Sequence, residues 1–488
     1  MTAAPQGYGT SALDFLFHPE SIAIVGLSTD PSKAWLSDCY VTPMLQMGYP
    51  GSLYVVNPKG GHIDGVSVYP SVKDIPGTID YVISLVPAQH TPRLLEECAA
   101  KGVRAVQFYT AGFSETGEPD DVQLQERLVS VARRLGMRLL GPNCMGLYCP
   151  ESRLGFCPDF PSETGSIGLL CQSGGNTGYI VRSAAARGLR FSKVISYGNA
   201  CDINECELLE YLANDDATRV ITAYIEGTTD GRQLLRSLSM AARRKPVIVL
   251  KGGETESGRR AAATHTGSLA GVDAVWDSLL KQAGALRVDS VEEMADVLVA
   301  MLQMRRPRGL NTCVIGIGGG SNVLATDDCE HAGLRLAPFP PHIAERVSAV
   351  LPPAGSMRRN PLDAFSLVGF PQGWQQLVDI LHDWEGLDLV LFHYAFGGPP
   401  LPPHYERIAP ALGPMTSAAK NVRLPMAVVL HSTPNNDSWQ ASLTVQRMCL
   451  EAGLPFFVSV SGAALAIRKV VEFGLANPGL LDRLLAEA

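Results

Sequence analysis

The stretch SIAIVGLSTDPSK, residues 21–33, decides the fold class of this chain. It begins with an apolar run of strand length that ends at Gly26 and continues as a polar turn. Similar apolar runs follow at strand–helix–strand spacing, and they predict strands at 21–26, 53–57, 81–86, 104–108 and 138–140. Amphipathic segments lie between them, for example 91–101 and 121–135. Strands that are apolar on both faces are typical of parallel sheets covered by helices on both sides, so we expect an α/β protein.

The alternation of strands and helices occurs twice more along the 488 residues. The second stretch, about 150–305, predicts strands at 166–171, 191–197, 219–225 and 246–250, and helices at 175–187, 203–213, 230–243 and 273–283. The third stretch follows the polar linker RRPRG, with strands at 312–317, 387–393 and 425–430, and helices at 321–333 and 437–452. We therefore predict three doubly wound α/β domains, at 1–148, 149–308 and 309–488.

The composition argues against several classes of protein. Hydrophobic residues make up 46% of the chain and charged residues 18%, which is typical of a well-buried globular protein. A net charge of −8 without a basic block argues against a nucleic-acid partner, and no apolar run is long enough to span a membrane. The N-terminus lacks the pattern of a secretory signal, so we expect a cytoplasmic protein. The 11 cysteines are scattered without zinc-like spacing, which predicts free thiols and no metal site.

The predicted strands of the first domain end in turns that share one edge of the sheet. The first turn, Gly26–Lys33, is not the GxGxxG of a dinucleotide site, but its Ser, Thr and backbone amide groups could hold phosphates. Lys59 follows the second strand, where it would either meet a phosphate or be solvated. Two later strands end in Val86-Pro87-Ala88 and Ala111-Gly112-Phe113. Ordinary turns are the alternative, but the convergence on one edge favours ligand binding.

Two further turns carry small or turn-forming residues. GPNCMG, 141–146, ends the first domain, and its Asn143 either forms the turn or points into a cleft between domains. In the second domain, QSGG at 172–175 separates a predicted strand from a predicted helix. Small residues there expose backbone N–H groups at a helix N-terminus, which is a physical site for an anion. The turn has neither the Lys nor the spacing of a P-loop, and a tight strand–helix turn is the alternative.

The segment KGGETESGRRAAATHTGSLAG, 251–271, is the most informative in the chain. It is rich in Gly, Ala, Ser and Thr, so we expect a mobile or cradle loop rather than a core helix. Within it, His265 lies between two threonines and precedes Gly267, so its small neighbours leave the ring accessible, as a nucleophile requires. Glu226 ends a neighbouring strand, where its carboxylate would fix the tautomer of His265. A surface or core histidine is the alternative.

A series of motifs, taken in order, resembles one known family. The motifs are SIAIVGLSTDP, GSLYVVNPKGGHIDGVSVYPSV, AGFSETGE, LLGPNCMGLY, CQSGG, SYGNACDINECELLEYLANDDATRVITAYIEG, KPVIVLKGGETESGRRAAATHTGSLAG and RRNPLD. From about residue 14 to the end, their order and spacing are similar to the α subunit of ADP-forming acyl-CoA synthetases, relatives of the succinyl-CoA synthetase α subunit. The resemblance implies an N-terminal Rossmann-like CoA-binding domain followed by two flavodoxin-like domains.

The resemblance also implies roles for individual residues. His265 would be the histidine that becomes phosphorylated, and Glu226 would orient or stabilise it. The residues that bind the phosphoryl group would be Ser173, Gly174, Gly175, Thr266 and Gly267. The residues that contact CoA would be Gly26, Ser28, Lys33, Lys59, Val86, Pro87, Ala88, Gly112, Phe113 and Asn143. Around QSGG, Cys171 and Asn176 depart from the family pattern, and Asn176 either tunes the acid accepted or has no role.

The reaction implied by the resemblance has three steps. ATP phosphorylates His265, the phosphoryl group passes to a carboxylic acid to give an acyl phosphate, and the CoA thiol attacks that carbonyl and releases phosphate. The ATP-grasp part of the family is not found in this sequence, whose residues are taken up by the three α/β domains. A separate ATP-grasp β subunit, which would bind ATP or ADP and Mg²⁺, is therefore implied, and the chain would be part of a hetero-oligomer.

Two alternatives stay open. A non-catalytic CoA-binding or regulatory protein could have lost the ATP-grasp part, although such a protein would usually lose the histidine too. A nicotinamide-dependent oxidoreductase built on the first domain is less consistent with the sequence, because GxGxxG is missing and Lys59 lies near where an acidic ribose anchor is expected. The acid is not fixed by the sequence, since acetate, branched, aryl and dicarboxylic acids are all compatible with it.

Overall fold

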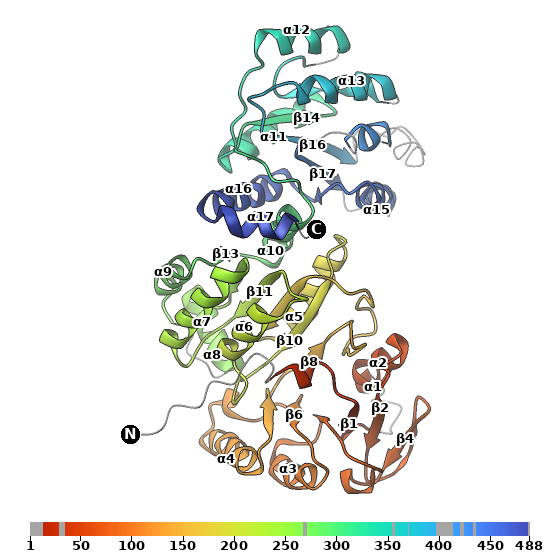
Figure 1. The fold of residues 1–488 in the computed structure, drawn as a ribbon, viewed down its shortest axis with the longest axis vertical. Coiled ribbons are helices and arrows are strands. Elements are labelled where there is room, and N and C mark those ends of the chain that lie inside the picture. The colour runs from red at the N-terminus through yellow and green to blue at the C-terminus, as the bar shows by residue number, and fades with distance from the viewer. Residues whose placement is uncertain are drawn as a thin grey trace. The chain divides into compact units, whose positions relative to one another are not determined.

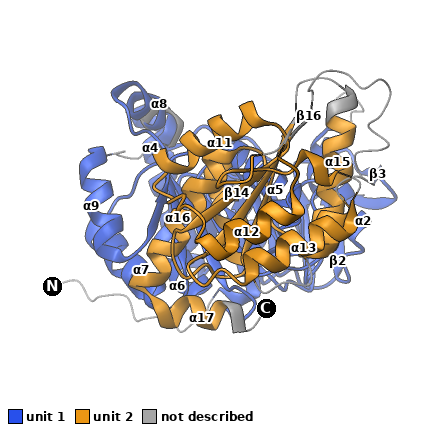
Figure 2. Cartoon of the chain, turned by 90° about the horizontal axis from the view of Figure 1, so that it is seen from above, with its two compact units in different colours: residues 1–291 blue, residues 292–488 orange. Residues whose placement is uncertain are grey.

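The computed structural model describes residues 13–28, 35–266, 271–353, 357–368, 370–396, 413–419, 424–432 and 436–486. The chain forms two compact units, residues 1–291 and 292–488, which are coloured separately in Figure 2. Two β-sheets belong to the first unit and one to the second. The division into three domains at 148 and 308 stays a prediction.

The first sheet has seven strands in the order β3-β4-β2-β1-β5-β6-β7 (Figure 1). Its strands are β1 (Ser21–Val25), β2 (Ser52–Val56), β3 (Gly61–Ile63), β4 (Val66–Tyr69), β5 (Tyr81–Ser84), β6 (Ala105–Phe108) and β7 (Arg138–Leu140). The strands pair in parallel, except that β3 runs antiparallel to β4 at the edge. Every residue of β1 is buried, which agrees with the apolar run that predicted it.

Short helical elements connect these strands. The α-helices are α1 (Trp35–Tyr40), α2 (Thr42–Met47), α3 (Thr91–Ala99) and α4 (Pro119–Leu135). The 3-10 helices are η2 (Asp14–Leu16), η4 (Val72–Asp74), η5 (Ala88–His90) and η6 (Ser114–Thr116). The apolar sides of α3 and α4 pack on the sheet in one cluster of buried residues that includes Leu95, Leu128 and Phe108.

The second sheet has six strands in the order β13-β12-β11-β9-β10-β8. Its strands are β8 (Gly146–Tyr148), β9 (Ile167–Cys171), β10 (Phe191–Ser196), β11 (Val220–Ile225), β12 (Val247–Lys251) and β13 (Leu286–Val288). Its helices are α5 (Gly174–Ala185), α6 (Glu205–Asn214), α7 (Gly231–Arg244), α8 (Glu256–Thr266) and α9 (Asp273–Ala283). The sheet is parallel except for β8, an antiparallel edge strand that pairs with β10.

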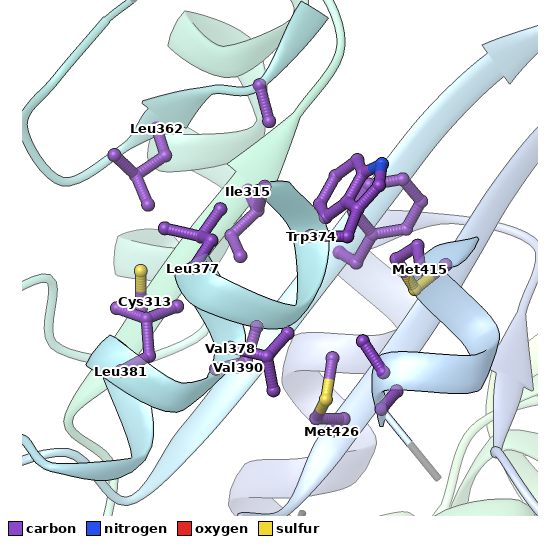
Figure 3. Close-up of a cluster of buried hydrophobic side chains, with 14 of the residues drawn as sticks. Cys313, Ile315, Leu362, Trp374, Leu377, Val378, Leu381, Val390, Met415 and Met426 are labelled. Carbon is purple, nitrogen blue, oxygen red and sulfur yellow. The ribbon is translucent and has the colours of Figure 1, made fainter. Parts of the chain in front are cut away.

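The second unit contains a parallel five-stranded sheet in the order β15-β14-β16-β17-β18. Its strands are β14 (Thr312–Gly316), β15 (Leu362–Asp363), β16 (Leu389–Phe396), β17 (Met426–Ser432) and β18 (Phe456–Phe457). Its helices are α10 (Val291–Leu302), α11 (Gly319–His331), α12 (Pro341–Val350), α13 (Pro371–His382), 413–419, α15 (Asn436–Glu451), α16 (Val460–Ala476) and α17 (Pro478–Ala486), with the 3-10 helix η7 (Phe365–Leu367). Figure 3 shows its core around Trp374, whose ring packs edge-on against Phe392 at 5.6 Å between centroids.

The expectation of a loop over 251–271 is wrong for most of its length, because α8 runs from Glu256 to Thr266. The physical reason lies in three features of this segment that favour a helix. The Thr255 hydroxyl accepts a hydrogen bond from the Gly258 amide at 3.0 Å, Arg260 pairs with Glu256 one turn earlier, and three alanines follow. A capped first turn and alanines of high helix propensity are sufficient for a short helix.

Three features bear on the classes of protein considered above. In the part of the chain that the structure describes, no helix is both long and apolar enough to cross a membrane. The same residues contain no group of three His, Cys, Asp or Glu side chains that could hold a metal ion. The cysteines are free thiols, as predicted, and most are buried.

Candidate active site

Three neighbouring parallel strands, β9, β11 and β12, end at one edge of the second sheet. Ser173 lies just beyond β9, Glu226 just beyond β11, and Lys251 ends β12. The Gln172 side-chain oxygen accepts hydrogen bonds from the backbone N–H groups of Glu226 at 2.7 Å and Gly227 at 3.2 Å. The structure therefore brings together the QSGG turn and Glu226, which the sequence analysis placed at the same edge.

The QSGG turn forms the N-terminus of helix α5. Ser173 is the N-cap, and its hydroxyl accepts from the Asn176 amide at 3.4 Å. A Cβ atom on Gly174 would lie 2.8 Å from Cγ of Met145, whereas one on Gly175 would meet none of the described residues within 4 Å. The first N–H groups of a helix have no acceptor within the helix, and the dipole makes this end positive. Beside open space at Gly175, these groups form a site suited to a phosphoryl group.

Glu226 is the carboxylate of this edge, and only 4% of its surface is exposed. The Tyr224 hydroxyl lies near the Glu226 carboxylate and the Asn176 side chain. Burial raises the pKa of Tyr224, and the negative charge of Glu226 raises it further. Tyr224 is thus held as a neutral phenol beside the carboxylate.

Lys251 is buried beside Glu226, with 3% of its surface exposed. Its Nζ donates to the backbone oxygen of Glu226 at 2.8 Å and to that of Gly252. The Nζ atom also lies 5.0 Å from the centroid of the Trp276 ring, in helix α9. Burial lowers the pKa of Lys251 to about 8, although the nearby Glu226 carboxylate acts in the opposite direction. Lys251 therefore links the end of β11 to the segments on either side of α8.

His265 lies in the last turn of α8. The side chains of His265 and Thr266, and the whole of Gly267, lie outside the described residues. The pairing of His265 with Glu226 therefore stays a prediction. The backbone of α8 contacts η6, the 3-10 helix that follows the AGF turn of the first sheet, so the helix that carries His265 lies against the predicted CoA-binding domain.

Most of the residues predicted to contact CoA lie at the carboxyl edge of the first sheet. Gly26 has a φ of 92°, and a Cβ atom there would lie 2.9 Å from the backbone nitrogen of Val86. Gly112, after β6, also has a positive φ, of 98°. Val86 and Pro87 precede η5, which begins at the buried Ala88. Glycine at these turns therefore lets the strand ends of this edge pack closely, as glycine turns do at nucleotide sites.

The remaining residues predicted to contact CoA differ in their position and burial. Ser28 follows β1, Lys59 is exposed after β2, and Lys33 lies outside the described residues. The Phe113 side chain is completely buried in the core, and the amide groups of Gly112 and Phe113 donate to the carboxylate of Glu115. A CoA contact at Phe113 would therefore have to come from its backbone.

Asn143 could have formed a turn or pointed into a cleft, and its backbone favours the first alternative. It has a φ of 58°, in the left-handed region where Asn is tolerated better than most residues. Its N–H donates to the backbone oxygen of Thr110 at 3.1 Å. The turn is held from the other side too, since the Asn199 amide donates to the backbone oxygen of Pro142 at 3.0 Å.

Three residues at this edge were not predicted from the sequence, namely Gln172, Tyr224 and Lys251. Gln172 carried no signal beyond its place in QSGG. Tyr224 precedes Glu226 by two positions, which places both side chains on one side of a strand. Lys251 ends a strand that is otherwise apolar, VIVLK, and a charge at the end of a buried strand is a signal that could have been used.

Comparisons with known proteins agree with this arrangement. Residues 20–150 match the CoA binding domain family, and residues 164–301 match the succinyl-CoA ligase like flavodoxin domain family. The chain is 37% identical over 351 residues to the acetate–CoA ligase (ADP-forming) II subunit alpha of Pyrococcus furiosus, covering 72% of this chain and 76% of that one. It is also 37% identical over 374 residues to the I subunit alpha of the same organism, covering 74% and 78%.

A solved structure shows the same fold. The acetyl-coenzyme A synthetase 1 of Ca. Korarchaeum cryptofilum, in complex with phosphate and ADP, matches with a TM-score of 0.78 at 28% identity. The match covers 97% of this chain and 99% of that chain. The predicted α/β fold class, with a CoA-binding domain followed by a flavodoxin-like ligase domain, is confirmed. The chain therefore belongs to the ADP-forming acyl-CoA synthetases, a family of acid–thiol ligases, in which its Pyrococcus relatives are α subunits.

Proposed function

We propose that this chain is the α subunit of an ADP-forming acyl-CoA synthetase that works through a phosphohistidine at His265. The observation that supports this most is the meeting of two features at one sheet edge. The α5 N-terminus offers backbone N–H groups suited to a phosphoryl group, and the buried Glu226 is tied to the same turn through Gln172.

The reaction consists of two group transfers after the histidine is phosphorylated. A ring nitrogen of His265 takes the γ-phosphoryl group of ATP, and ADP leaves. A carboxylate oxygen of the acid then attacks the phosphorus, the P–N bond breaks, and an acyl phosphate forms. The CoA thiol, losing its proton, attacks the acyl carbonyl, and inorganic phosphate leaves. In these steps the α5 N-terminus, with Thr266 and Gly267, would hold the phosphoryl group, and Glu226 would orient His265.

CoA would bind at the carboxyl edge of the first sheet. The glycine turns at Gly26 and Gly112 allow a close approach of backbone, and Lys59 is exposed at the same edge for a phosphate group. Ser28, Lys33 and the segment 86–88 complete the proposed set. The contact of α8 with η6 supports this placement, because it brings the His265 helix against the domain that would supply the thiol.

A partner subunit would supply the nucleotide. The Pyrococcus relatives are named as subunits, which supports a hetero-oligomer. We propose that the partner has an ATP-grasp fold and binds ATP or ADP with Mg²⁺, and that the complex acts in the cytoplasm. We also propose that the chain divides into domains at about 148 and 308, with the phosphohistidine in the middle domain.

The test is phosphoryl transfer to the full chain. The wild type and His265→Ala are incubated with ATP and Mg²⁺, with and without a candidate ATP-grasp subunit, and the intact mass is measured. We expect an acid-labile phosphoryl group on the wild type that requires the partner and is absent from His265→Ala. Phosphate and an acyl-CoA should label the wild type without the partner, through the reverse reaction.

Two results would contradict this proposal. Label that persists in His265→Ala would show that another residue is phosphorylated. If neither route labels the wild type while CoA still binds, the chain is a non-catalytic CoA-binding protein. CoA binding can be measured by calorimetry, with NAD⁺ as the control ligand for the oxidoreductase alternative.

A further inference from the structure

We propose that Glu115 is a positioning residue for CoA. Its buried carboxylate holds the AGF turn, residues 111–113, in the conformation that binds CoA, and it ties this turn to the second sheet through Asn199. The inference rests on the proposed function, which places CoA at the carboxyl edge of the first sheet. It adds to that site a residue outside the set proposed to contact CoA.

The carboxylate of Glu115 is almost completely withdrawn from water. Glu115 lies in η6, directly after the AGF turn, and only 7% of its surface is exposed. Its oxygens accept from the Gly112 amide at 2.6 Å and from the Phe113 amide, which lies 3.2 Å from each of them. A buried carboxylate needs such donors to offset its loss of hydration. Because both donors belong to the turn, the carboxylate fixes the backbone of the turn.

A third donor comes from the second sheet. The side-chain nitrogen of Asn199, in the loop after β10, donates to Glu115 Oε2 at 2.5 Å and to the side-chain oxygen of Gln125 at 3.2 Å. Both hydrogens of this amide are thus directed at acceptor oxygens, which fixes its orientation. The backbone N–H of Asn199 also donates to the oxygen of Pro142 at 3.0 Å. Glu115 is therefore joined to the second sheet by a side chain that is itself fixed.

The AGF turn is also joined to the neighbouring turn of the first sheet, residues 86–88. The Thr110 hydroxyl donates to the backbone oxygen of Val86 at 2.7 Å. A Cβ atom on Gly112 would lie 3.6 Å from Cβ of Ala88, which is an ordinary van der Waals distance. The two turns therefore lie side by side, and both belong to the set proposed to contact CoA. A group that fixes one of them fixes part of the surface offered to CoA.

The physical role of Glu115 follows from the glycine in the turn. Gly112 has a φ of 98°, and glycine has more backbone freedom than any other residue. Fixing such a residue costs conformational entropy, and a turn that is already fixed spares the ligand this cost. The carboxylate itself, however, repels a ligand that carries several phosphate charges. Positioning and charge therefore predict opposite effects on CoA affinity when the carboxylate is removed.

The experiment measures the Kd of the full chain for CoA by isothermal titration calorimetry. The variants are Glu115→Ala, Glu115→Gln, Asn199→Ala and the double variant Glu115→Ala/Asn199→Ala, each compared with wild type. CoA binding requires neither the carboxylic acid nor the nucleotide, so the result does not depend on which acid the enzyme uses. Urea unfolding of every variant shows how much stability each change removes.

We expect Glu115→Ala to raise the Kd for CoA about tenfold, because the turn loses its acceptor and its fixed conformation. Glu115→Gln keeps one oxygen for the Gly112 amide but loses the charge that strengthens the hydrogen bonds, so its Kd should rise about threefold. Asn199→Ala should also raise the Kd about threefold. The double variant should bind no more weakly than Glu115→Ala, because Asn199 acts on the turn through the carboxylate.

Two variants serve as controls. Glu118→Ala removes an exposed carboxylate three positions further along, so it reports the effect of charge alone, and its Kd should be equal to that of wild type or slightly lower. Arg138→Met removes another link between the same two sheets, the pairing of Arg138 with Asp202 and Glu207. Arg138 begins β7, at the opposite edge of the first sheet from the AGF turn. This variant should lose stability and keep the CoA affinity of wild type.

Three results would overturn the inference. The first is a Kd of Glu115→Gln equal to or below that of wild type, which decides the question even if Glu115→Ala does not fold. The second is an equal loss of affinity in Arg138→Met, which would show that any loosening of the two sheets weakens CoA binding. The third is a double variant in which the two losses multiply. If wild type itself binds no CoA, the proposed function fails first, so the wild-type titration separates the two failures.

Discussion

Lys251 is an ammonium group in a position where burial disfavours its charge. Its pKa is about 8 in the folded chain against 10.5 for an unperturbed lysine, so the folded chain holds this proton less tightly than the unfolded chain does. The free-energy cost of burying the charged ammonium group is therefore present in full below about pH 8, and it decreases as the pH rises toward 10.5. Relative to Lys251→Met, the wild type should gain about 2 kcal/mol of stability between about pH 7.5 and about pH 9.5. Urea unfolding at both pH values measures this.

Lys281→Met controls for the loss of a positive charge, since Lys281 is 76% exposed on α9. A stability difference between wild type and Lys251→Met that does not change with pH would contradict the prediction. In Lys251→Met, the backbone carbonyl groups of Glu226 and Gly252 lose their hydrogen-bond donor at both pH values. That loss therefore cancels when the stability difference between wild type and variant at one pH is compared with the difference at the other.

At the residue scale, the sequence pointed to Glu226 and to the QSGG turn because strand ends of a parallel sheet share an edge. The sequence could not show that the Gln172 side chain accepts a hydrogen bond from the Glu226 backbone N–H. Hydrogen bonds between the ends of separate strands depend on the register of those strands. Asn176 stood out only as a departure from a family pattern. Its position near Tyr224 brings together residues 48 positions apart, which local sequence patterns do not report.

At the element scale, helix α8 shows where composition misled. Gly, Ser and Thr in 251–271 favoured a loop, but they gather at the two ends of the segment, while the middle is GRRAAA. A helix can begin with a capped first turn and a run of residues of high helix propensity, provided that tertiary contacts stabilise it. Here η6 supplies such contacts. The accessibility of His265 stays a prediction, because its side chain lies outside the described residues.

Helix α5 gives a prediction that separates stability from activity. Gly174→Ala places a methyl group against Met145 and should destabilise the fold by about 1 kcal/mol, because the helix end must move. Gly175→Ala places its methyl group in open space and should stabilise the helix by up to about 1 kcal/mol. Yet its methyl group would stand where the proposed site holds the phosphoryl group, so labelling by phosphate and acyl-CoA should slow on the order of tenfold. Denaturation and labelling of the same two proteins test this; a Gly175→Ala variant labelled at the wild-type rate would move the phosphoryl site elsewhere.

At the scale of the whole molecule, the apolar runs predicted the interior strands of the sheets well. The strands of the first two sheets that were predicted lie within two residues of their expected bounds. The edge strands β3, β8 and β13 were missed because each is only three residues long, and the interior strand β4 was missed because only one of its four residues is buried. Two of these edge strands are antiparallel, so the sheets are mixed at their borders rather than purely parallel.

The first unit joins two sheets, and Arg138 forms ion pairs between them. It lies on β7 of the first sheet and donates to Asp202 at 2.9 Å and to both oxygens of Glu207 at 2.9 and 2.7 Å, residues that precede and begin α6 of the second sheet. Burial by itself would lower the pKa of Arg138, but the hydrogen bond to Glu207 and the charge of Asp202 raise it. Asp202 also accepts from the Leu139 N–H, so the contact fixes the strand as well as the side chain.

Removing this guanidinium leaves two partly buried carboxylates without their counter-ion. Arg138→Met should therefore lower the free energy of unfolding by about 2 kcal/mol, and Arg138→Lys by less, since it keeps the charge but loses the two-pronged geometry. Arg190→Met is the matched control, because Arg190 pairs at 3.3 Å with the 65% exposed Glu163 and should cost under about 1 kcal/mol. Urea unfolding followed by tryptophan fluorescence and circular dichroism measures all three. Equal losses in Arg138→Met and Arg190→Met would show that the Arg138 ion pairs contribute no more to stability than an exposed ion pair does.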